Sequence, residues 1–566
     1  MIPKTVLIFA IYFAHSVCGD SVTLSQGVVK GFQAKSRSSK DYYGFKGIPF
    51  GKVEKRFDIP KPAGNWSGIF DATLDYPGCM DVGIFPFSHG AEDCLKLDVY
   101  TPKVITASEK MPVLVWIYGG GFFFGSTKEY GPEYFMDEDV VLVLINYRLG
   151  PLGFLNAGIA SARGNQGLKD QVLGLKWIQE NIENFGGNKD KVTIFGESAG
   201  AMSVSLHVTS PMAKGLFHSV ISQSGTALQS FIAANWERGV DQAVKLAQDN
   251  DCPTSHKEYM VECLQRIDPI HLGFTSIGMD DYGLRPDTGL TMPSLETYSD
   301  GVDDPNVYLK ENPLDLLKSG RFNQVPVIMG LIGWESYAAA SLVIKSHRNT
   351  NKLDAQWGRI GLRLMELSHQ AEDPSEAMVS IKKKFFSNNA ITNESLWELE
   401  HVTSERQWTH PFRVQAELLS HHVPVYLYNF TRTVPYKPSG LDIPMFNFLV
   451  EDGATTKKPS HAEDLPYVFK LGDIYSMMLP NISAHEEEVN VSKDMVKTWV
   501  NFARERNLKT SPWSNWEPIS SENFYGSKYF EIGDALDVKQ VPEEWKELDE
   551  FWEGLKLKEM GGKWTS

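Results

Sequence analysis

Cysteine is scarce in this chain of 566 residues, which contains only five. Beyond the N-terminal stretch there is no apolar run of the roughly 20 residues that a membrane-spanning helix needs. Positive charge is also in short supply, with 55 Lys and Arg against 71 Asp and Glu and a net charge of −16. Because that charge repels phosphate backbones and anionic lipids, the sequence predicts no nucleic-acid partner and no membrane anchor.

Metal-ligand patterns and internal repeats are missing too. The acidic run from His485 to Glu488 is typical of a solvated helix face, so we assign it no metal. Hydrophobic residues make up 42% of the chain and charged residues 22%, which is ordinary for a globular protein with a large core. We expect no metal and no cofactor, and the composition says nothing about oligomeric state.

The two ends of the chain predict secretion. Lys4 precedes the apolar residues 6–14 and small residues follow, which is the pattern of a signal peptide over residues 1–19. The C-terminal residues form neither an ER-retention tetrapeptide nor a GPI-anchor tail. We therefore expect an extracellular protein whose residues 20–566 form a single domain.

Removal of the signal peptide takes Cys18 with it and leaves an even number of cysteines in an oxidising compartment. Two disulfides are favoured over four buried thiols. Four cysteines allow three connectivities, of which the two close pairs would form small surface staples. The cysteines are Cys79, Cys94, Cys252 and Cys263. Export also makes five Asn-X-Ser/Thr sequons candidate glycosylation sites, at Asn65, Asn393, Asn429, Asn481 and Asn490.

Short β-rich runs alternate with helical stretches along the chain. This alternation indicates an α/β fold with a large, mostly parallel central sheet and helices on both faces. The expected strands cover residues 112–117, 140–146, 192–195, 220–223, 325–329 and 423–428. Residues 166–185 place apolar side chains at helical spacing before Gly186, which predicts a core-facing helix that ends there.

Three further regions complete the expected organisation. Residues 229–320 are rich in turns and acidic residues, and residues 340–420 contain several helical stretches. We interpret both as insertions that roof a site, not as separate domains. The amphipathic residues 542–560 predict a helix that packs on the same domain.

The pentapeptide from Gly196 to Gly200, with Ser198 at its centre, follows one expected strand and precedes an expected helix. That is the context of a G-x-S-x-G nucleophile elbow, in which the glycines allow the close packing of a sharp strand-to-helix turn. The pentapeptide alone is a weak signal, since it also occurs by chance in loops. Its position between strand and helix predicts that Ser198 is a nucleophile.

A serine nucleophile needs a general base and an acid that orients the base. Glu335 follows the expected strand 325–329, and His461 lies in a loop after the expected strand 423–428. Both therefore belong at the carboxyl edge of the sheet, where Ser198 also lies, and they occur in the chain order Ser, Glu, His. Taken singly, each is more often a surface carboxylate or a hydrogen-bonded histidine, but together they predict a catalytic triad.

Residues 118–122 read Tyr-Gly-Gly-Gly-Phe and directly follow the expected strand 112–117. Glycines let backbone N–H groups approach a substrate closely, and an ester tetrahedral intermediate needs such donors for its oxyanion. We predict an oxyanion hole made by the N–H groups of Gly120, Gly121 and Ala199. A purely structural turn is the alternative.

Together these segments resemble a known family, the type-B carboxylesterases of the cholinesterase and carboxylesterase group, and within it the secreted insect esterases. The match covers nearly all of the mature chain. The resemblance implies the triad, the three oxyanion donors and the disulfides Cys79–Cys94 and Cys252–Cys263. The segments that carry it are residues 92–100, 118–122, 146–150, 164–167, 195–200 and the residues around His461.

Departures from the family narrow the expected substrate. Cholinesterases carry a tryptophan between the first two cysteines that holds the choline cation, whereas the 14 residues between Cys79 and Cys94 include none. Juvenile-hormone esterases usually carry Gln before the nucleophile, but Glu197 stands here. The stretch 48–57 is also shorter than in the family and lacks its Pro-Pro pair, so we expect a rebuilt surface loop. Candidate acyl-pocket residues are Phe122, Phe123, Phe124 and Phe231, with core packing as the alternative.

The sequence therefore predicts a secreted serine carboxylesterase that acts on uncharged small-molecule esters, such as odorant, dietary or xenobiotic esters. Two other functions fit the same fold. One is a non-catalytic adhesion protein, which would dispense with the nucleophile, and the other is a protein that sequesters esters with slow turnover.

Overall fold

In a computed structural model of the protein, the described residues are 20–81, 90–103, 110–230, 232, 236–277, 291–296, 305–346, 352–368, 370–433 and 459–557. The predicted signal peptide and the candidate pocket residue Phe231 lie outside these ranges.

The described residues form a central sheet of 11 strands in the order β20-β19-β17-β16-β15-β14-β9-β11-β8-β4-β3. The strands from β19 to β11 in this order run parallel to one another. All six predicted strands belong to this parallel part. They are β9 (Met111–Ile117), β11 (Val141–Ile145), β14 (Gly187–Glu197), β15 (Ser219–Gln223), β16 (Val327–Ile332) and β17 (Val425–Phe430).

The parallel strands are recognisable in the sequence because both of their faces are covered. Every residue of β9 and β11 is buried, and the two strands read MPVLVWI and VLVLI. Strands buried on both faces are continuous apolar runs without polar alternation. The prediction of a mostly parallel α/β sheet is therefore confirmed, and the fold is that of an α/β-hydrolase.

The two edges of the sheet are antiparallel and were not predicted. On one side β8 (Lys96–Thr101), β4 (Asp41–Pro49) and β3 (Phe32–Lys35) pair in antiparallel fashion. On the other side, β19 (Lys528–Ile532) and β20 (Leu536–Gln540) form a hairpin. These strands carry charged and exposed residues, so they do not form the apolar runs that mark the centre.

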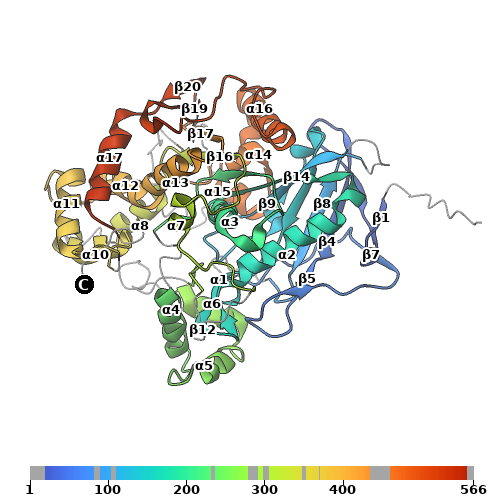
Figure 1. The fold of residues 1–566 in the computed structure, drawn as a ribbon, viewed down its shortest axis with the longest axis horizontal. Helices are drawn as coiled ribbons and strands as arrows, with labels where there is room; N and C mark the ends of the chain where they lie inside the picture. Colours follow the sequence, from blue (N-terminus) through green and yellow to red (C-terminus); the bar gives the residue numbers. More distant parts are fainter. Residues whose placement is uncertain are drawn as a thin grey trace, which may run out of the picture.

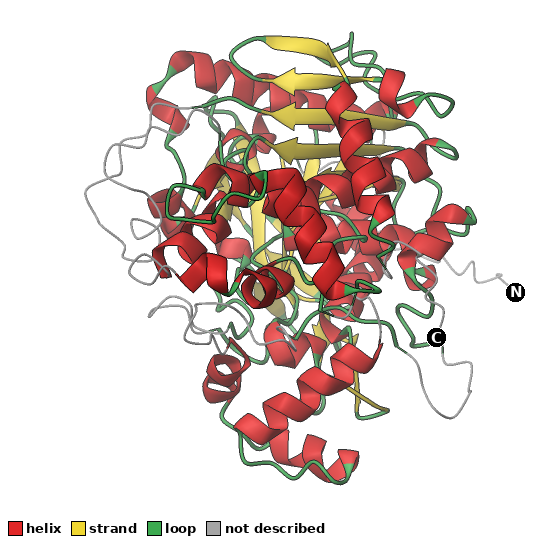
Figure 2. Ribbon diagram, turned by 90° about the vertical axis from the view of Figure 1, so that its left-hand side faces the viewer, coloured by secondary structure: helices red, strands yellow, loops and turns green. Residues whose placement is uncertain are grey.

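Helices lie on both faces of the sheet (Figure 2). The predicted helix 166–185 is α2 (Gln166–Asn181), whose last turn tightens into a 3-10 helix before Gly186. Helix α3 (Ala199–Thr209) packs against β14 and β15, and α16 (Glu486–Glu505) packs against β9 and β14. Figure 1 shows α2 and α3 side by side in front of the strands.

The two predicted insertions contain several helices in their described parts. The first contains α4 (Trp236–Asp249), α5 (Lys257–Leu264), α6 (Pro269–Ile277) and α7 (Pro313–Lys318). The second runs from α8 (Tyr337–Ser346) to α13 (His410–Ser420) and has a hydrophobic cluster of its own. The predicted C-terminal helix is α17 (Glu543–Gly554), whose Trp552 belongs to that cluster (Figure 1).

Candidate active site

Ser198 stands at the turn between β14 and α3, at the carboxyl edge of the sheet. Its backbone has φ 56° and ψ −124°, a strained conformation for a residue other than glycine. Two glycines make this turn possible. A Cβ atom on Gly200 would lie 1.9 Å from the carbonyl oxygen of Ile117, and one on Gly196 would lie 2.5 Å from the carbonyl carbon of Gly200. The serine therefore has the backbone of a nucleophile elbow, and 8% of its surface stays exposed.

Glu335 and His461 meet in the structure although 126 residues separate them in the chain. Glu335 follows β16, and an isolated parallel bridge pairs Trp334 with Ser460, which places the next residue of each segment side by side. The Nδ1 atom of His461 lies 2.6 Å from Oε2 of Glu335. The other oxygen, Oε1, accepts the N–H of Ile332 at 2.8 Å. Because a carboxylate only accepts, Nδ1 carries the proton and Nε2 is left to act as a base.

Glu197 is a second carboxyl group beside the imidazole. Its Oε1 lies 3.2 Å from Nε2 of His461, and its side chain is 3% exposed. Burial raises the pKa of Glu197 to about 8, although the histidine charge opposes the shift. Burial alone would lower the pKa of His461, but Glu197 and Glu335 together raise it to about 9. In the sequence, Glu197 was recognised only as a position that differs from the Gln of juvenile-hormone esterases, and its contact with His461 was not predicted.

An aromatic ring from the second insertion covers the same histidine. The ring centroids of Trp408 and His461 are 4.4 Å apart, with 46° between the ring planes. Trp408 is 9% exposed. It lies in the π-helical turn Glu405–Thr409, between α12 (Leu396–Ser404) and α13. No role was predicted for Trp408 from the sequence, because no sequence pattern identifies a π-helical turn.

The glycine loop after β9 lies directly against the elbow. A Cβ atom on Gly119 would lie 2.6 Å from the carbonyl oxygen of Glu197. Gly120 and Gly121 have φ angles of 103° and 61°, in the region that glycine tolerates. Within the described part of the chain, the N–H groups of Gly120, Gly121 and Ala199 have no hydrogen-bond partner in the protein. They are therefore available to an oxygen atom of a ligand.

The chain matches the sequences and structures of known proteins over nearly its whole length. The family model described as "Carboxylesterase family" matches residues 19–549.

The chain belongs to the carboxylesterase family.

It is an ester hydrolase, as its named relatives are. Juvenile hormone esterase of Tribolium castaneum is 32% identical over 94% of this chain and 92% of its own length. Esterase E4 of Myzus persicae is 30% identical over 88% of each chain. The crystal structure of juvenile hormone esterase from Manduca sexta, with OTFP covalently attached, superimposes with a TM-score of 0.81 at 25% identity. It covers 95% of this chain and 99% of the other.

The three consecutive phenylalanines of this carboxylesterase have different surroundings. Phe122 is fully buried and packs edge-on against Phe154, with ring centroids 5.1 Å apart. Phe123 and Phe124 keep exposed surface and contact each other at 5.4 Å. Phe123 and Phe124 are therefore half-buried, whereas Phe122 has the surroundings of a core residue.

Both disulfides implied by the family resemblance are present. Cys79 is bonded to Cys94 and Cys252 to Cys263. Among the sequons, Asn65, Asn393, Asn481 and Asn490 are exposed, whereas Asn429 lies within β17, half-buried between two other strands. The exposed asparagines are better placed to carry a glycan.

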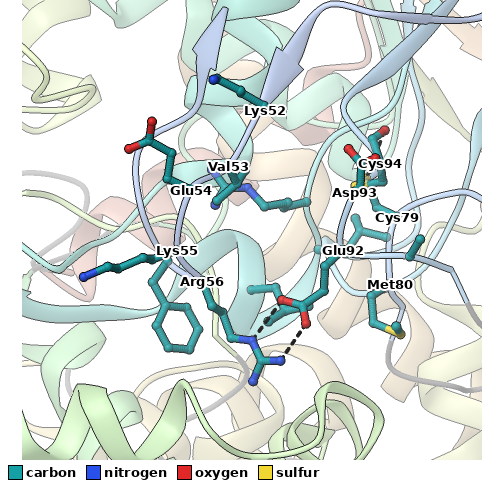
Figure 3. A pocket seen from close by; sticks show the side chains of 15 residues that line it. Lys52, Val53, Glu54, Lys55, Arg56, Cys79, Met80, Glu92, Asp93 and Cys94 are labelled. Carbon is teal, nitrogen blue, oxygen red and sulfur yellow. Dashed lines mark hydrogen bonds and ion pairs between the residues drawn. A yellow bond between two sulfur atoms is a disulfide. The ribbon is translucent and has the colours of Figure 1, made fainter. Parts of the chain in front are cut away.

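A separate hollow of about 310 Å³ lies beside the first disulfide, and neither the triad residues nor the glycine loop line it (Figure 3). Residues 52–57 form one wall, and Leu149 and Leu152 contribute apolar surface. Arg56 crosses it to form a two-pronged ion pair with Glu92, at 2.6 and 2.9 Å. This pair connects residues 52–57 to the segment that ends at Cys94.

The described residues contain neither a candidate membrane-spanning helix nor a candidate metal site. None of their helices has the length and apolar character needed to cross a bilayer. In the same residues no group of three or more His, Cys, Asp or Glu side chains is arranged to hold a metal ion.

Proposed function

We propose that the enzyme hydrolyses uncharged carboxylic esters in two steps, with Ser198 as nucleophile, His461 as general base and Glu335 as the residue that orients the histidine. The observation that carries the proposal is the 2.6 Å contact between Nδ1 of His461 and Glu335, next to a serine held in a strained elbow. That contact fixes the tautomer in which Nε2 can take a proton.

In the first step Oγ of Ser198 attacks the ester carbonyl carbon while Nε2 of His461 takes the hydroxyl proton. The carbonyl oxygen becomes an oxyanion, and the N–H groups of Gly120, Gly121 and Ala199 stabilise it. When the tetrahedral intermediate collapses, the protonated histidine returns the proton to the leaving alcohol. Water then attacks the acyl-enzyme by the same route and releases the acid.

Among the described residues, no hydrogen bond joins Ser198 to His461, since Nε2 lies near Glu197 instead. A bound ester would bring the serine and the histidine together, as catalytic hydrogen bonds often tighten only in the substrate complex. Burial raises the pKa of Glu197, which weakens the ion pair that this carboxyl group would otherwise form with the histidine.

The substrate class follows from what surrounds the site. The cysteine loop contains no tryptophan for a cation, and Phe123 and Phe124 offer apolar surface beside the glycine loop. We therefore propose neutral esters. Glu197 replaces the Gln that is usual in juvenile-hormone esterases, so we do not extend the hormone named for two relatives to this chain. Secretion is part of the proposal, because it rests on the predicted signal peptide.

Covalent labelling tests the nucleophile. An organophosphate should inactivate the enzyme with one equivalent bound, and a peptide map should place the label on Ser198. A label on another residue would overturn the assignment. A protein that sequesters esters would label in the same way, so the steady-state turnover number must be measured beside it. Repeated turnover supports hydrolysis, and a single burst equal to the enzyme concentration supports sequestration.

A further inference from the structure

We propose that Trp408, presented by the π-helical turn Glu405–Thr409, is a positioning residue that holds the imidazole ring of His461 in the orientation needed for proton transfer. The inference deepens the proposed function and rests on it, because it assumes that His461 is the base. A hydrogen bond at Nδ1 fixes one atom of the imidazole ring. That bond does not by itself fix the rotation of the ring about Cβ–Cγ, and a contact on the ring face restricts this rotation further.

The contact geometry fits that role. The 4.4 Å between the ring centroids is direct van der Waals contact, and the indole is almost fully buried. The histidine side chain keeps 24% of its surface exposed, so the protein does not enclose it completely. The tryptophan therefore supplies one wall of an otherwise open position.

The helical segment that carries Trp408 also contacts the residue next to Glu335. Four residues earlier, the hydroxyl of Ser404 accepts the N–H of Ser336, next to Glu335, at 2.9 Å. The same hydroxyl donates to Glu400, one turn further back. Helix α12 and the turn that follows it thus contact both the Glu335 loop and the His461 ring.

A buried charge cluster holds the π-helical turn in place. The guanidinium of Arg413 bonds both oxygens of Glu405, at 3.1 and 2.8 Å, and contacts Asp549 of α17 at 2.9 Å. Nδ1 of His410 lies 2.6 Å from the same aspartate. These bonds fix Glu405, the first residue of the turn, and His410, the residue that follows the turn. π-helical turns are costly in isolation and often occur at functional sites.

The indole also acts on the charge of the histidine. An aromatic face within about 6 Å favours a cation. The carboxyl groups that face the imidazole are Glu335, Glu197 and Asp464, and all three raise its pKa. Because these groups stay in place when Trp408 is replaced, any change in the pH profile reports on the tryptophan.

The test compares Trp408→Leu and Trp408→Phe with Trp357→Phe. Trp357 is a buried tryptophan of the same insertion that packs on Phe386, and the structure places it in the second hydrophobic cluster. The measurements are kcat and KM for p-nitrophenyl acetate, the pH profile of kcat/KM, and thermal unfolding.

The proposal predicts that W408L lowers kcat about ten-fold, changes KM less than about two-fold, and moves the acid limb down by about half a pH unit. W408F should restore most of kcat, since it keeps an aromatic face. W357F should lower the unfolding temperature but leave the acid limb of the kcat/KM pH profile unchanged. Wild-type kcat and pH profile in folded W408L would overturn the inference. If Ser198→Ala kept its activity, the proposed function itself would fail, which is a separate outcome.

Discussion

Glu197 and Glu335 hold the imidazole of His461 from opposite nitrogens, with Oε2 of Glu335 2.6 Å from Nδ1 and Oε1 of Glu197 3.2 Å from Nε2. The two carboxyl groups have different surroundings. Glu335 accepts a backbone N–H and the histidine, whereas burial raises the pKa of Glu197 to about 8. The orienting group and the group beside the reactive nitrogen therefore stand in different electrostatic surroundings.

Replacing Glu197 with Gln should shift the pH dependence of catalysis. The carboxyl charge raises the pKa of His461, so a neutral amide lowers it and the base form of Nε2 becomes available at lower pH. The acid limb of kcat/KM should therefore move to lower pH, which a profile from about pH 5 to about pH 10 measures. Glu197→Asp keeps the charge and should move the limb less. A limb that stays in place in E197Q would refute the coupling.

The same residue should make stability depend on pH. The pKa of Glu197 is higher in the folded protein than its ordinary value of 4.5, and that of His461 is higher than 6.5. The folded state binds these protons more tightly, so the stability that the two groups contribute is fully present below their ordinary pKa values and is lost as pH rises through about 8 for Glu197 and about 9 for His461.

Urea unfolding at about pH 6 and about pH 9 measures this loss. The wild type should lose at least about 1 kcal/mol more than E197Q over that interval. Glu54→Gln removes an exposed carboxylate instead and should behave like the wild type. Equal losses in wild type and E197Q would mean that Glu197 is not protonated in the folded protein.

The elbow glycine should tolerate no side chain. Gly200→Ala puts a Cβ atom 1.9 Å from the carbonyl oxygen of Ile117, so strand or helix must move at a cost of about 3 kcal/mol. Activity should fall as well, because α3 carries Ala199. Gly358→Ala in α10 (Trp357–Leu364) is the matched control. Nothing lies within 4 Å of its new atom, and it should gain about 0.5 to 1 kcal/mol. A wild-type unfolding midpoint for G200A would contradict the packing.

The disulfide Cys252–Cys263 should contribute to stability but not to chemistry. It joins the segment before α5 to the last turn of that helix and belongs to a cluster apart from the main core. Replacing both cysteines with Ala should lower the free energy of unfolding by about 2 to 3 kcal/mol. The kcat of the folded protein should stay within about two-fold of the wild type. A loss of kcat without a loss of stability would contradict this reading.

The centre of the fold and most of the candidate site were predictable from local sequence. Strands such as β9 and β11 are apolar throughout because neighbours cover both faces, and Ser198 is marked by the elbow glycines around it. Strand β4 was missed, since it carries charged residues and glycines and so is no continuous apolar run. The pairing of Glu335 with His461 could be predicted only as an order of residue types along the chain.

The contacts that tune the histidine were not predictable in the same way. Glu197 directly precedes Ser198, and the side chain of Glu197 lies near Nε2 of His461 because of the backbone conformation of this turn. Trp408 reaches His461 because a π-helical turn interrupts two ordinary α-helices, and a helical spacing argument takes no account of such a turn. Both contacts join residues far apart in the chain, so no local pattern records them.

The most direct test of the central claim is ester turnover by Ser198→Ala. The hydroxyl is the only group removed, and circular dichroism and the unfolding midpoint establish that the variant is folded. The account predicts that folded S198A loses p-nitrophenyl acetate hydrolysis by at least about a thousand-fold, down to what the oxyanion donors alone provide. Turnover near that of the wild type would contradict the assignment of Ser198 as the nucleophile.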